Sequence, residues 1–164
     1  MATQSSDFIE VSGEKLIDRI RTSGKRAVIV NAWASWCGPC RREMPMLLAL
    51  ESNLAPRGIG VMLVSVDEPA SRAAAVAFLQ QNGAPLPSYI AERPLGPFKL
   101  ALNPSWPGML PASFLFDASG KLRYFWGGEA FEEELLKVVD EFLAGTLVDG
   151  QARFGLAPGK VETP

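Results

Sequence analysis

The chain has 164 residues, which is close to the usual size of one domain and enough to bury a hydrophobic core without metals or structural disulfides. Its 16 lysine and arginine residues against 18 aspartate and glutamate residues argue against nucleic acid or an anionic membrane surface as a partner. It has no apolar stretch of about 20 residues, and residues 1–7 lack the basic and apolar regions of a signal peptide. We therefore expect a soluble single domain without a membrane span.

The cysteine and histidine content limits which kinds of catalytic and metal site the chain can form. The only two cysteines, Cys37 and Cys40, are separated by two residues, and histidine is absent. A closed zinc site takes about four Cys or His ligands, so a metal site here would need ligands from a partner. Without histidine, a Cys-His nucleophile pair is excluded, and proton transfer must use carboxylates, water or the thiols. We expect neither a metal nor an organic cofactor.

The first half of the chain alternates between strand and helix patterns. In chain order we expect a short strand at 8–11, a helix at 12–24, a strand at 27–34 that is covered on both faces, a helix at 38–54 kinked by Pro45, and a second buried strand at 59–66.

The second half continues the pattern, with one irregular stretch. We expect a helix at 71–82, a short strand at 88–91, turns and short elements over the proline-rich stretch 85–111, a hairpin of 112–117 with 121–126, and a closing amphipathic helix over 131–142. Together these elements predict an α/β fold with a mixed central sheet of about five strands flanked by helices. Residues 1–144 would form the domain, and 145–164 a loosely attached tail.

The cysteine pair lies where the buried strand 27–34 passes into the helix 38–54. Two cysteines at this spacing can close a small disulfide ring, and a helix that begins beside the first one stabilises its thiolate through free backbone N–H groups and the helix dipole. We therefore interpret Cys37 as the attacking sulfur and Cys40 as the sheltered, resolving sulfur of thiol–disulfide exchange. The alternative is a pair of core cysteines or a local structural disulfide.

Two segments resemble the thioredoxin superfamily. Residues 32–40, Ala-Trp-Ala-Ser-Trp-Cys-Gly-Pro-Cys, are similar to the thioredoxin active-site segment, and Arg-Arg-Glu-Met-Pro at 41–45 extends the match. Residues 110–117, Leu-Pro-Ala-Ser-Phe-Leu-Phe-Asp, resemble the stretch that holds the cis-proline of the family. Over residues 8–144 the central insertion and the length resemble the TlpA/ResA-type proteins more than the short cytosolic thioredoxins.

This resemblance implies a thioredoxin fold and a protein dithiol–disulfide oxidoreductase. Members of the TlpA/ResA group pass electrons to oxidised protein dithiols, including those of cytochrome c and copper-site assembly, and are periplasmic or otherwise extracytoplasmic. We accordingly expect protein disulfide substrates, an upstream thiol reductant and a monomer. Because the chain shows no signal or anchor, a cytoplasmic location is the alternative.

The resemblance also assigns residues around the dithiol. Pro111 would take a cis peptide bond beside the sulfurs and leave the backbone of Leu110 free to pair with an extended partner. Trp36 would form an apolar lip at the contact face, with Gly38 and Pro39 beside it. The expected contact surface therefore consists of Trp36, Gly38, Pro39 and Leu110, next to the two cysteines and Pro111.

Glu43 is the candidate proton carrier. It follows Cys40 by three residues, so both side chains should lie on one helix face, where the carboxylate could take and return the proton of the resolving thiol. A glutamate at this position is functional in the ResA-like group. Asn31 stands where short thioredoxins carry a buried aspartate, and since an amide cannot shuttle that proton, the task would pass to Glu43. The alternative is a solvated glutamate that only complements the helix dipole.

Several alternatives stay open at the level of sequence. The dithiol could serve an oxidase or isomerase of disulfides, or act as ligands in a copper- or heme-pathway module; a thiol peroxidase has less support because no peroxide-binding motif is present. Trp106 could line a partner groove or fix a loop. Asp67 and Glu68 fit a helix cap better than an acidic site. We favour a reductase, because the Gly38-Pro39 dipeptide is that of thioredoxin.

Overall fold

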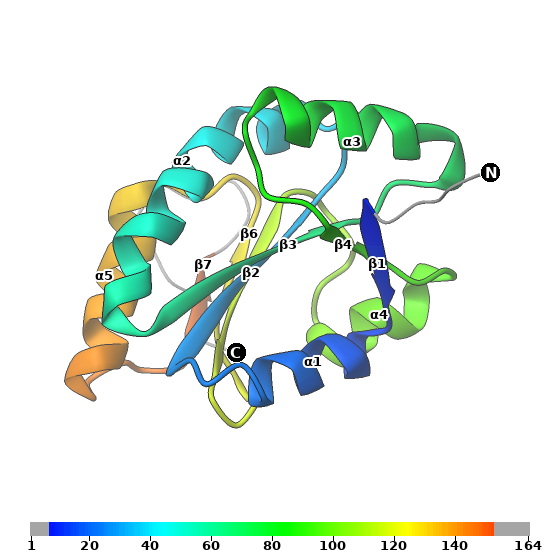
Figure 1. Cartoon of the computed structure of the whole chain (residues 1–164). Helices are drawn as coiled ribbons and strands as arrows, with labels where there is room; N and C mark the ends of the chain where they lie inside the picture. Colours follow the sequence, from blue (N-terminus) through cyan, green and yellow to red (C-terminus); the bar gives the residue numbers. More distant parts are fainter. Residues whose placement is uncertain (1–6, 153–164) are drawn as a thin grey trace.

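A seven-stranded mixed sheet runs through residues 7–152, the part of the chain that the computed structural model describes (Figure 1). The strand order is β1-β4-β3-β2-β5-β6-β7, with β5 antiparallel to both of its neighbours and the other pairs parallel. The mixed α/β fold is confirmed, but the expected number of about five strands is too low: each strand expected along the chain is present, and the unexpected edge strand β7 is added to them. The strands are β1 (Phe8–Val11), β2 (Ala27–Trp33), β3 (Ile59–Ser65), β4 (Ser88–Ala91), β5 (Ala112–Asp117), β6 (Leu122–Gly127) and β7 (Gly150–Ala152).

Helices cover both faces of the sheet. In Figure 1, α1 and α4 lie together on one side, and α2 lies on the other side between α3 and α5. The predicted helix at 38–54 is confirmed, and it continues through Pro45. The helices are α1 (Gly13–Arg21), α2 (Gly38–Leu54), α3 (Arg72–Gln81), α4 (Leu95–Leu102) and α5 (Glu132–Ala144), with short 3-10 turns at Ala55–Arg57 and Pro69–Ser71.

The central strand β2 is buried along its whole length. Its side chains alternate between two core clusters: Val28 and Val30 pack in the cluster that contains Leu16 of α1, and Ile29 packs in the cluster that contains Leu47 of α2. A strand covered on both faces carries a continuous apolar run, which is how this strand was predicted. The end of β2 is therefore a well-packed base for the loop that follows it.

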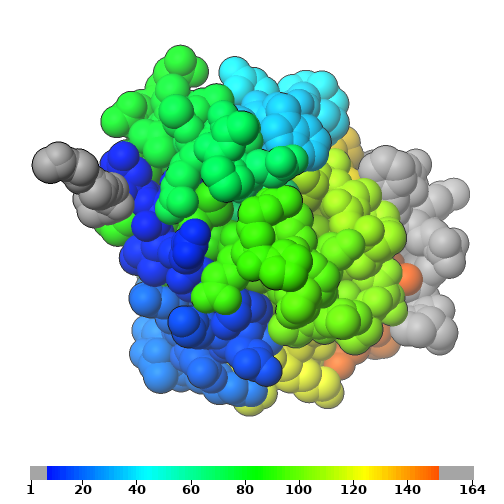
Figure 2. Space-filling view, turned by 90° about the vertical axis from the view of Figure 1, so that its right-hand side faces the viewer, coloured from blue at the N-terminus to red at the C-terminus, as the bar shows by residue number. Residues whose placement is uncertain are grey.

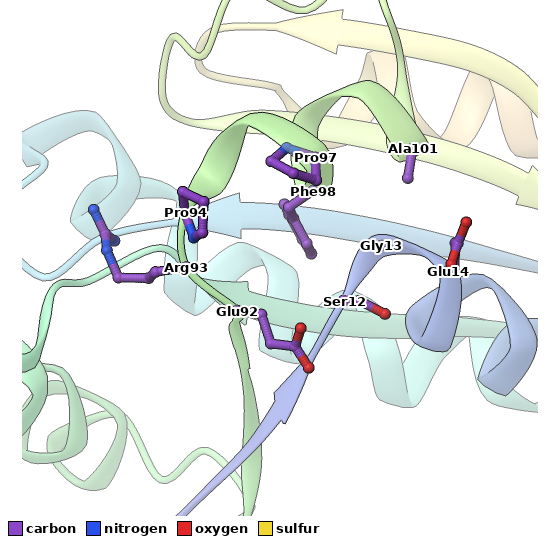
Figure 3. A pocket seen from close by; sticks show the side chains of 9 residues that line it. All are labelled: Ser12, Gly13, Glu14, Glu92, Arg93, Pro94, Pro97, Phe98 and Ala101. Carbon is purple, nitrogen blue, oxygen red and sulfur yellow. The ribbon is translucent and has the colours of Figure 1, made fainter.

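The proline-rich stretch 85–111 contains the helix α4, which packs against α1; in Figure 2 its green residues lie beside the blue residues of the N-terminal elements. A Cβ on Gly13 would clash with the Cβ of Ala101, so the two helices approach closely at this point. A cavity of about 220 Å³ opens next to the crossing, with Glu14 and Glu92 among its lining residues (Figure 3). None of residues 32–45, which contain the two cysteines, lines this cavity.

The sheet continues beyond residue 144, where the domain was predicted to end. After Gly145, which closes α5 with a φ of 77°, the chain returns so that β7 pairs in parallel with β6. Asp149 binds the Nε of Arg123 at 2.6 Å, which ties this return to the sheet. Residues 145–152 thus include a strand, while the rest of the predicted tail, 153–164, lies outside the described residues.

Candidate active site

Cys37 and Cys40 lie where β2 ends and α2 begins. Cys37 is the N-cap of α2, and its sulfur accepts a hydrogen bond from the backbone N–H of Cys40 at 3.3 Å. The N–H of Cys37 donates to the carbonyl of Ala34 at 3.1 Å, and Pro39 stands in the first turn of the helix, where its missing N–H costs little. The two sulfurs form a disulfide, with Cα atoms 5.3 Å apart. Both sulfurs therefore sit at the positive end of the helix dipole.

The two cysteines differ in their access to solvent. Cys37 is 6% exposed and Cys40 is 1% exposed. Trp36, immediately before Cys37, is 65% exposed, and Gly38, immediately after it, is exposed as well. The neighbours of Cys37 on both sides thus form open surface, so a partner can approach Cys37 more readily than Cys40.

Pro111 lies at the same edge of the sheet as the cysteines. The antiparallel register pairs Ala32 of β2 with Ala112 of β5, so the residue before Ala112 falls alongside the end of β2. The cis peptide bond predicted between Leu110 and Pro111 is confirmed. Leu110 packs against the core cluster that contains both cysteines, and the carbonyl of Pro111 accepts a hydrogen bond from Gly128 at 2.8 Å.

Glu43 is a buried carboxyl group one helical turn beyond Cys40. Its side chain is on the inner face of α2, where Oε1 accepts a hydrogen bond from Asn31 Nδ2 at 2.6 Å and Oε2 accepts one from the N–H of Ala130 at 2.9 Å. Burial raises the pKa of Glu43 to about 7; the two hydrogen bonds oppose this shift, and the charges of Glu129 and Glu134 add to it. The alternative of a solvated glutamate is therefore wrong for this position. A carboxyl group with this pKa can both release and take up a proton near neutral pH.

Asn31 and Ser113 complete the surroundings of Glu43, and Ser113 was not among the predicted site residues. Asn31 Nδ2 donates a second hydrogen bond to Ser113 Oγ at 3.1 Å, whereas Asn31 Oδ1 has no hydrogen-bond partner among the described residues. The register of β2 and β5 places these two residues opposite each other. Pairing the predicted strands 27–34 and 112–117 could have found Ser113, but no local pattern identifies Ala130.

Asp67 does not cap a helix, which corrects the expectation for this residue. The N-cap of the 3-10 turn at Pro69–Ser71 is Glu68, whose side chain makes no capping hydrogen bond, and Asp67 is instead buried, with 1% of it exposed. Its carboxylate accepts hydrogen bonds from the N–H of Ser35 at 3.0 and 3.2 Å and from the hydroxyl of Ser35 at 2.6 Å. The hydroxyls of Ser65 and Ser71 donate to it at 2.7 and 2.8 Å. This carboxylate is therefore bound to the loop that precedes Cys37.

Trp106 fixes a loop. Its indole Nε1 donates to the carbonyl of Met109 at 2.9 Å, and its ring meets Phe114 edge-on with centroids 5.2 Å apart. Since only 4% of Trp106 is exposed, it belongs to the support of the segment before Pro111.

The described residues contain no group of three or more His, Cys, Asp or Glu side chains that could hold a metal ion. Within the same residues, each helix is too short or too polar to cross a membrane.

The chain is similar in sequence to known thiol–disulfide proteins. The AhpC/TSA family matches residues 9–125. The thiol-disulfide oxidoreductase ResA of Geobacillus thermodenitrificans is 27% identical over 135 residues, which cover 82% of this chain and 74% of that protein. The thiol:disulfide interchange protein HelX of Rhodobacter capsulatus is 33% identical over 118 residues, which cover 72% of this chain and 61% of HelX.

Solved structures agree on the fold. A thiol:disulfide interchange protein of the thioredoxin family from Chlorobium tepidum superposes with a TM-score of 0.62 and 24% sequence identity, over 87% of this chain and 97% of that one. The fold of the chain is therefore thioredoxin-like.

Proposed function

Because this chain belongs to the AhpC/TSA family and is a thioredoxin-like thiol–disulfide oxidoreductase, we propose that its Cys37–Cys40 dithiol reduces disulfide bonds of partner proteins. The observation that carries the proposal is the pair of sulfurs at the start of α2, joined in a disulfide, with the first of them the more exposed.

The exchange proceeds in two steps. The Cys37 thiolate attacks one sulfur of the partner disulfide, so that a Cys37–partner disulfide forms and the other partner sulfur leaves as a thiolate. Cys40 then loses its proton and attacks the Cys37 sulfur; the Cys37–Cys40 disulfide forms and the second partner thiolate leaves. Two electrons pass in total from the dithiol to the partner; the dithiol gives up one proton when Cys37 ionises and one when Cys40 does, and the two partner thiolates take up two protons. An upstream thiol reductant returns the pair to the dithiol.

Cys37 is suited to the first step by its place in the helix. The unpaired N–H groups of the first turn and the helix dipole stabilise a thiolate at the N-cap, as the hydrogen bond from the N–H of Cys40 illustrates. Cys40 is almost fully buried and forms the disulfide with Cys37, so it is placed to resolve a mixed disulfide rather than to meet a partner first. In this proposal the partner would contact Trp36, Gly38, Pro39 and Leu110.

Glu43 would handle the proton of the resolving thiol. It lies on the same helix as Cys40, three residues on, is buried beside β2, and changes its protonation state near pH 7. In the resolving step the ionised carboxyl takes the proton of Cys40, and in the reverse step it returns it. Pro111 would shape the groove in which the partner backbone lies against Leu110.

The Gly38-Pro39 dipeptide supports the reductant direction. This dipeptide occurs in thioredoxin, whose reduction potential is about −270 mV, against about −120 mV for the oxidant DsbA. The names of the relatives, thiol-disulfide oxidoreductase and thiol:disulfide interchange protein, support dithiols and disulfides as the substrates. An extracytoplasmic location and a monomer as the working unit are part of the proposal.

The test is the reduction potential of the Cys37–Cys40 couple, measured by equilibration with defined thiol–disulfide buffers, together with reduction of insulin. A potential near that of thioredoxin, with insulin reduction that Cys37→Ser abolishes, is the expected result. A potential near that of DsbA would instead assign an oxidase or isomerase role, and tight binding of copper by the reduced protein would favour a metal-pathway module.

A further inference from the structure

We propose that Asp67 is a positioning residue of the dithiol site: its buried carboxylate fixes the segment Ser35–Trp36 and thereby sets the direction from which Cys37 attacks. The proposal rests on the proposed function, because it concerns the same exchange reaction. Asp67 lies far from the cysteines in the sequence and was predicted to do no more than cap a helix.

The carboxylate of Asp67 joins three parts of the chain. Ser35 binds it from the loop between β2 and α2, through both its N–H and its hydroxyl. Ser65 binds it from the end of β3, and Ser71 binds it from the 3-10 turn before α3. A buried carboxylate is costly unless hydrogen bonds satisfy its oxygens, and here neutral donors supply all of the bonds that the structure gives it. The arrangement therefore holds each donor in one place.

The backbone of Ser35 is held at both of its polar groups. Its N–H donates to Asp67, and its carbonyl accepts a hydrogen bond from Arg41 Nη1 at 3.2 Å. The guanidinium of Arg41 is itself fixed over the ring of Phe78, 4.3 Å from the centroid. The backbone next to Asp67 is held as well, because Arg93 Nη1 donates to the carbonyl of Val66, the residue before Asp67, at 3.1 Å. The exposed Trp36 and the nucleophile thus follow directly after a peptide unit that cannot move freely.

This fixation has a consequence for the reaction. A sulfur attacks a disulfide along the line of the bond that breaks, and small displacements of a reacting atom lower the rate strongly. Cys37 is held on one side by the helix cap, and on the other by its N–H bond to the carbonyl of Ala34 and by the fixed peptide unit of Ser35. Without Asp67, the N–H of Ser35 loses its partner and the loop gains conformational freedom, although the cysteines stay in the chain.

The experiment compares variants of the reduced full-length protein in their reaction with the small disulfide DTNB, at a pH at which the Cys37 thiol is fully ionised. The limiting rate then reports the placement of the thiolate rather than the fraction that is ionised. We expect Asp67→Ala to lower this rate about tenfold or more, and Asp67→Asn, which keeps an acceptor for Ser35, to stay within about twofold of the wild type. Ile20→Ala, on the buried face of α1, is the control for general loss of stability and should leave the rate unchanged.

Ser35→Ala keeps the proposal testable if Asp67→Ala does not fold. It removes the hydroxyl bond alone and should slow the reaction about fivefold in the wild-type background. Where Asp67→Ala folds, adding Ser35→Ala to it should cause no further loss, because the two residues act through one contact. An Asp67→Ala rate equal to that of Ile20→Ala, an Asn variant as slow as the Ala variant, or additive losses would each overturn the proposal.

Insulin reduction by the wild type separates the two proposals. If the wild type and the variants react with DTNB at rates in the expected order, but the wild type does not reduce insulin, the reductase function fails and the role of Asp67 stands. If the wild type reduces insulin and Asp67→Ala does so equally well, the role of Asp67 fails and the function stands.

Discussion

Replacing Glu43 by glutamine should change how the stability of the protein depends on pH. In the folded protein burial raises the pKa of Glu43 from 4.5 to about 7, so the fold favours the neutral form. Below about pH 4.5 the group is protonated in both the folded and the unfolded chain and contributes nothing to the pH dependence. As the pH rises towards 7, the unfolded chain releases the proton and the folded chain keeps it, so the wild type loses stability.

The size of the effect follows from the shift. About 2.5 pH units at 1.36 kcal/mol each give a loss of about 3 kcal/mol between pH 4.5 and 7, with little further change above pH 7. Glutamine has nearly the shape of glutamate and does not ionise. Its amide can be accommodated if the side-chain amide of Asn31 turns over, since Asn31 Oδ1 has no partner among the described residues and can accept from the new N–H group.

The assay is urea unfolding of the oxidised wild type and of oxidised Glu43→Gln, followed by tryptophan fluorescence at half-unit steps from pH 4.5 to 8.5. Oxidised protein is used because the disulfide removes the titration of the cysteines. Contributions of other groups cancel in the difference between the two proteins. We expect the glutamine variant to gain about 3 kcal/mol relative to the wild type across this range. A difference that does not vary with pH would refute the raised pKa and with it the proton-carrier role of Glu43.

Three further outcomes test the site. Cys40→Ser should accumulate a mixed disulfide through Cys37 when it is mixed with a protein disulfide, measured by mass spectrometry of the intact protein, and failure to trap any would contradict the two-step exchange. Trp36→Ala should change the free energy of unfolding by less than about 0.5 kcal/mol, because the side chain is 65% exposed, yet raise the KM for insulin; an unchanged KM would remove Trp36 from the contact surface. Asn31→Asp places a second carboxyl group against Glu43 and should cost more than about 2 kcal/mol in urea unfolding at pH 8, and less at pH 5; equal costs at both values would show that the two groups do not interact.

The fold and the dithiol could be predicted because their signals are local. The apolar run of β2, the two cysteines and the helical spacing of α2 lie within one continuous stretch, and the chain order of strands and helices restricts the possible topologies. The edge strand β7 was missed since its three residues show neither alternation nor β-branched side chains, and its pairing depends on contacts such as Asp149 with Arg123. Helix α4 was not distinguished because prolines surround it.

The environment of the site residues was less accessible to prediction. The position of Glu43 on the face of Cys40 follows from a spacing of three residues, whereas its burial follows from Ala130, which is 87 residues away in sequence. Asp67 shows the same limit, because its partner Ser35 is 32 residues away. Charged side chains with long-range partners look like surface residues in the sequence, and only the assembled fold reveals the donors that keep them inside.

The strand β7 also decides where this chain can be shortened safely. A strand at the edge of a sheet offers unpaired N–H and C=O groups to any extended chain nearby, and proteins cover such edges to avoid self-association. β7 covers β6 from Tyr124 to Trp126, along the most aromatic strand of this sheet. A version that ends at residue 144 would keep the dithiol and its helix, but the edge of β6 would be left unpaired and exposed. We would therefore expect aggregation rather than loss of chemistry to be its first defect.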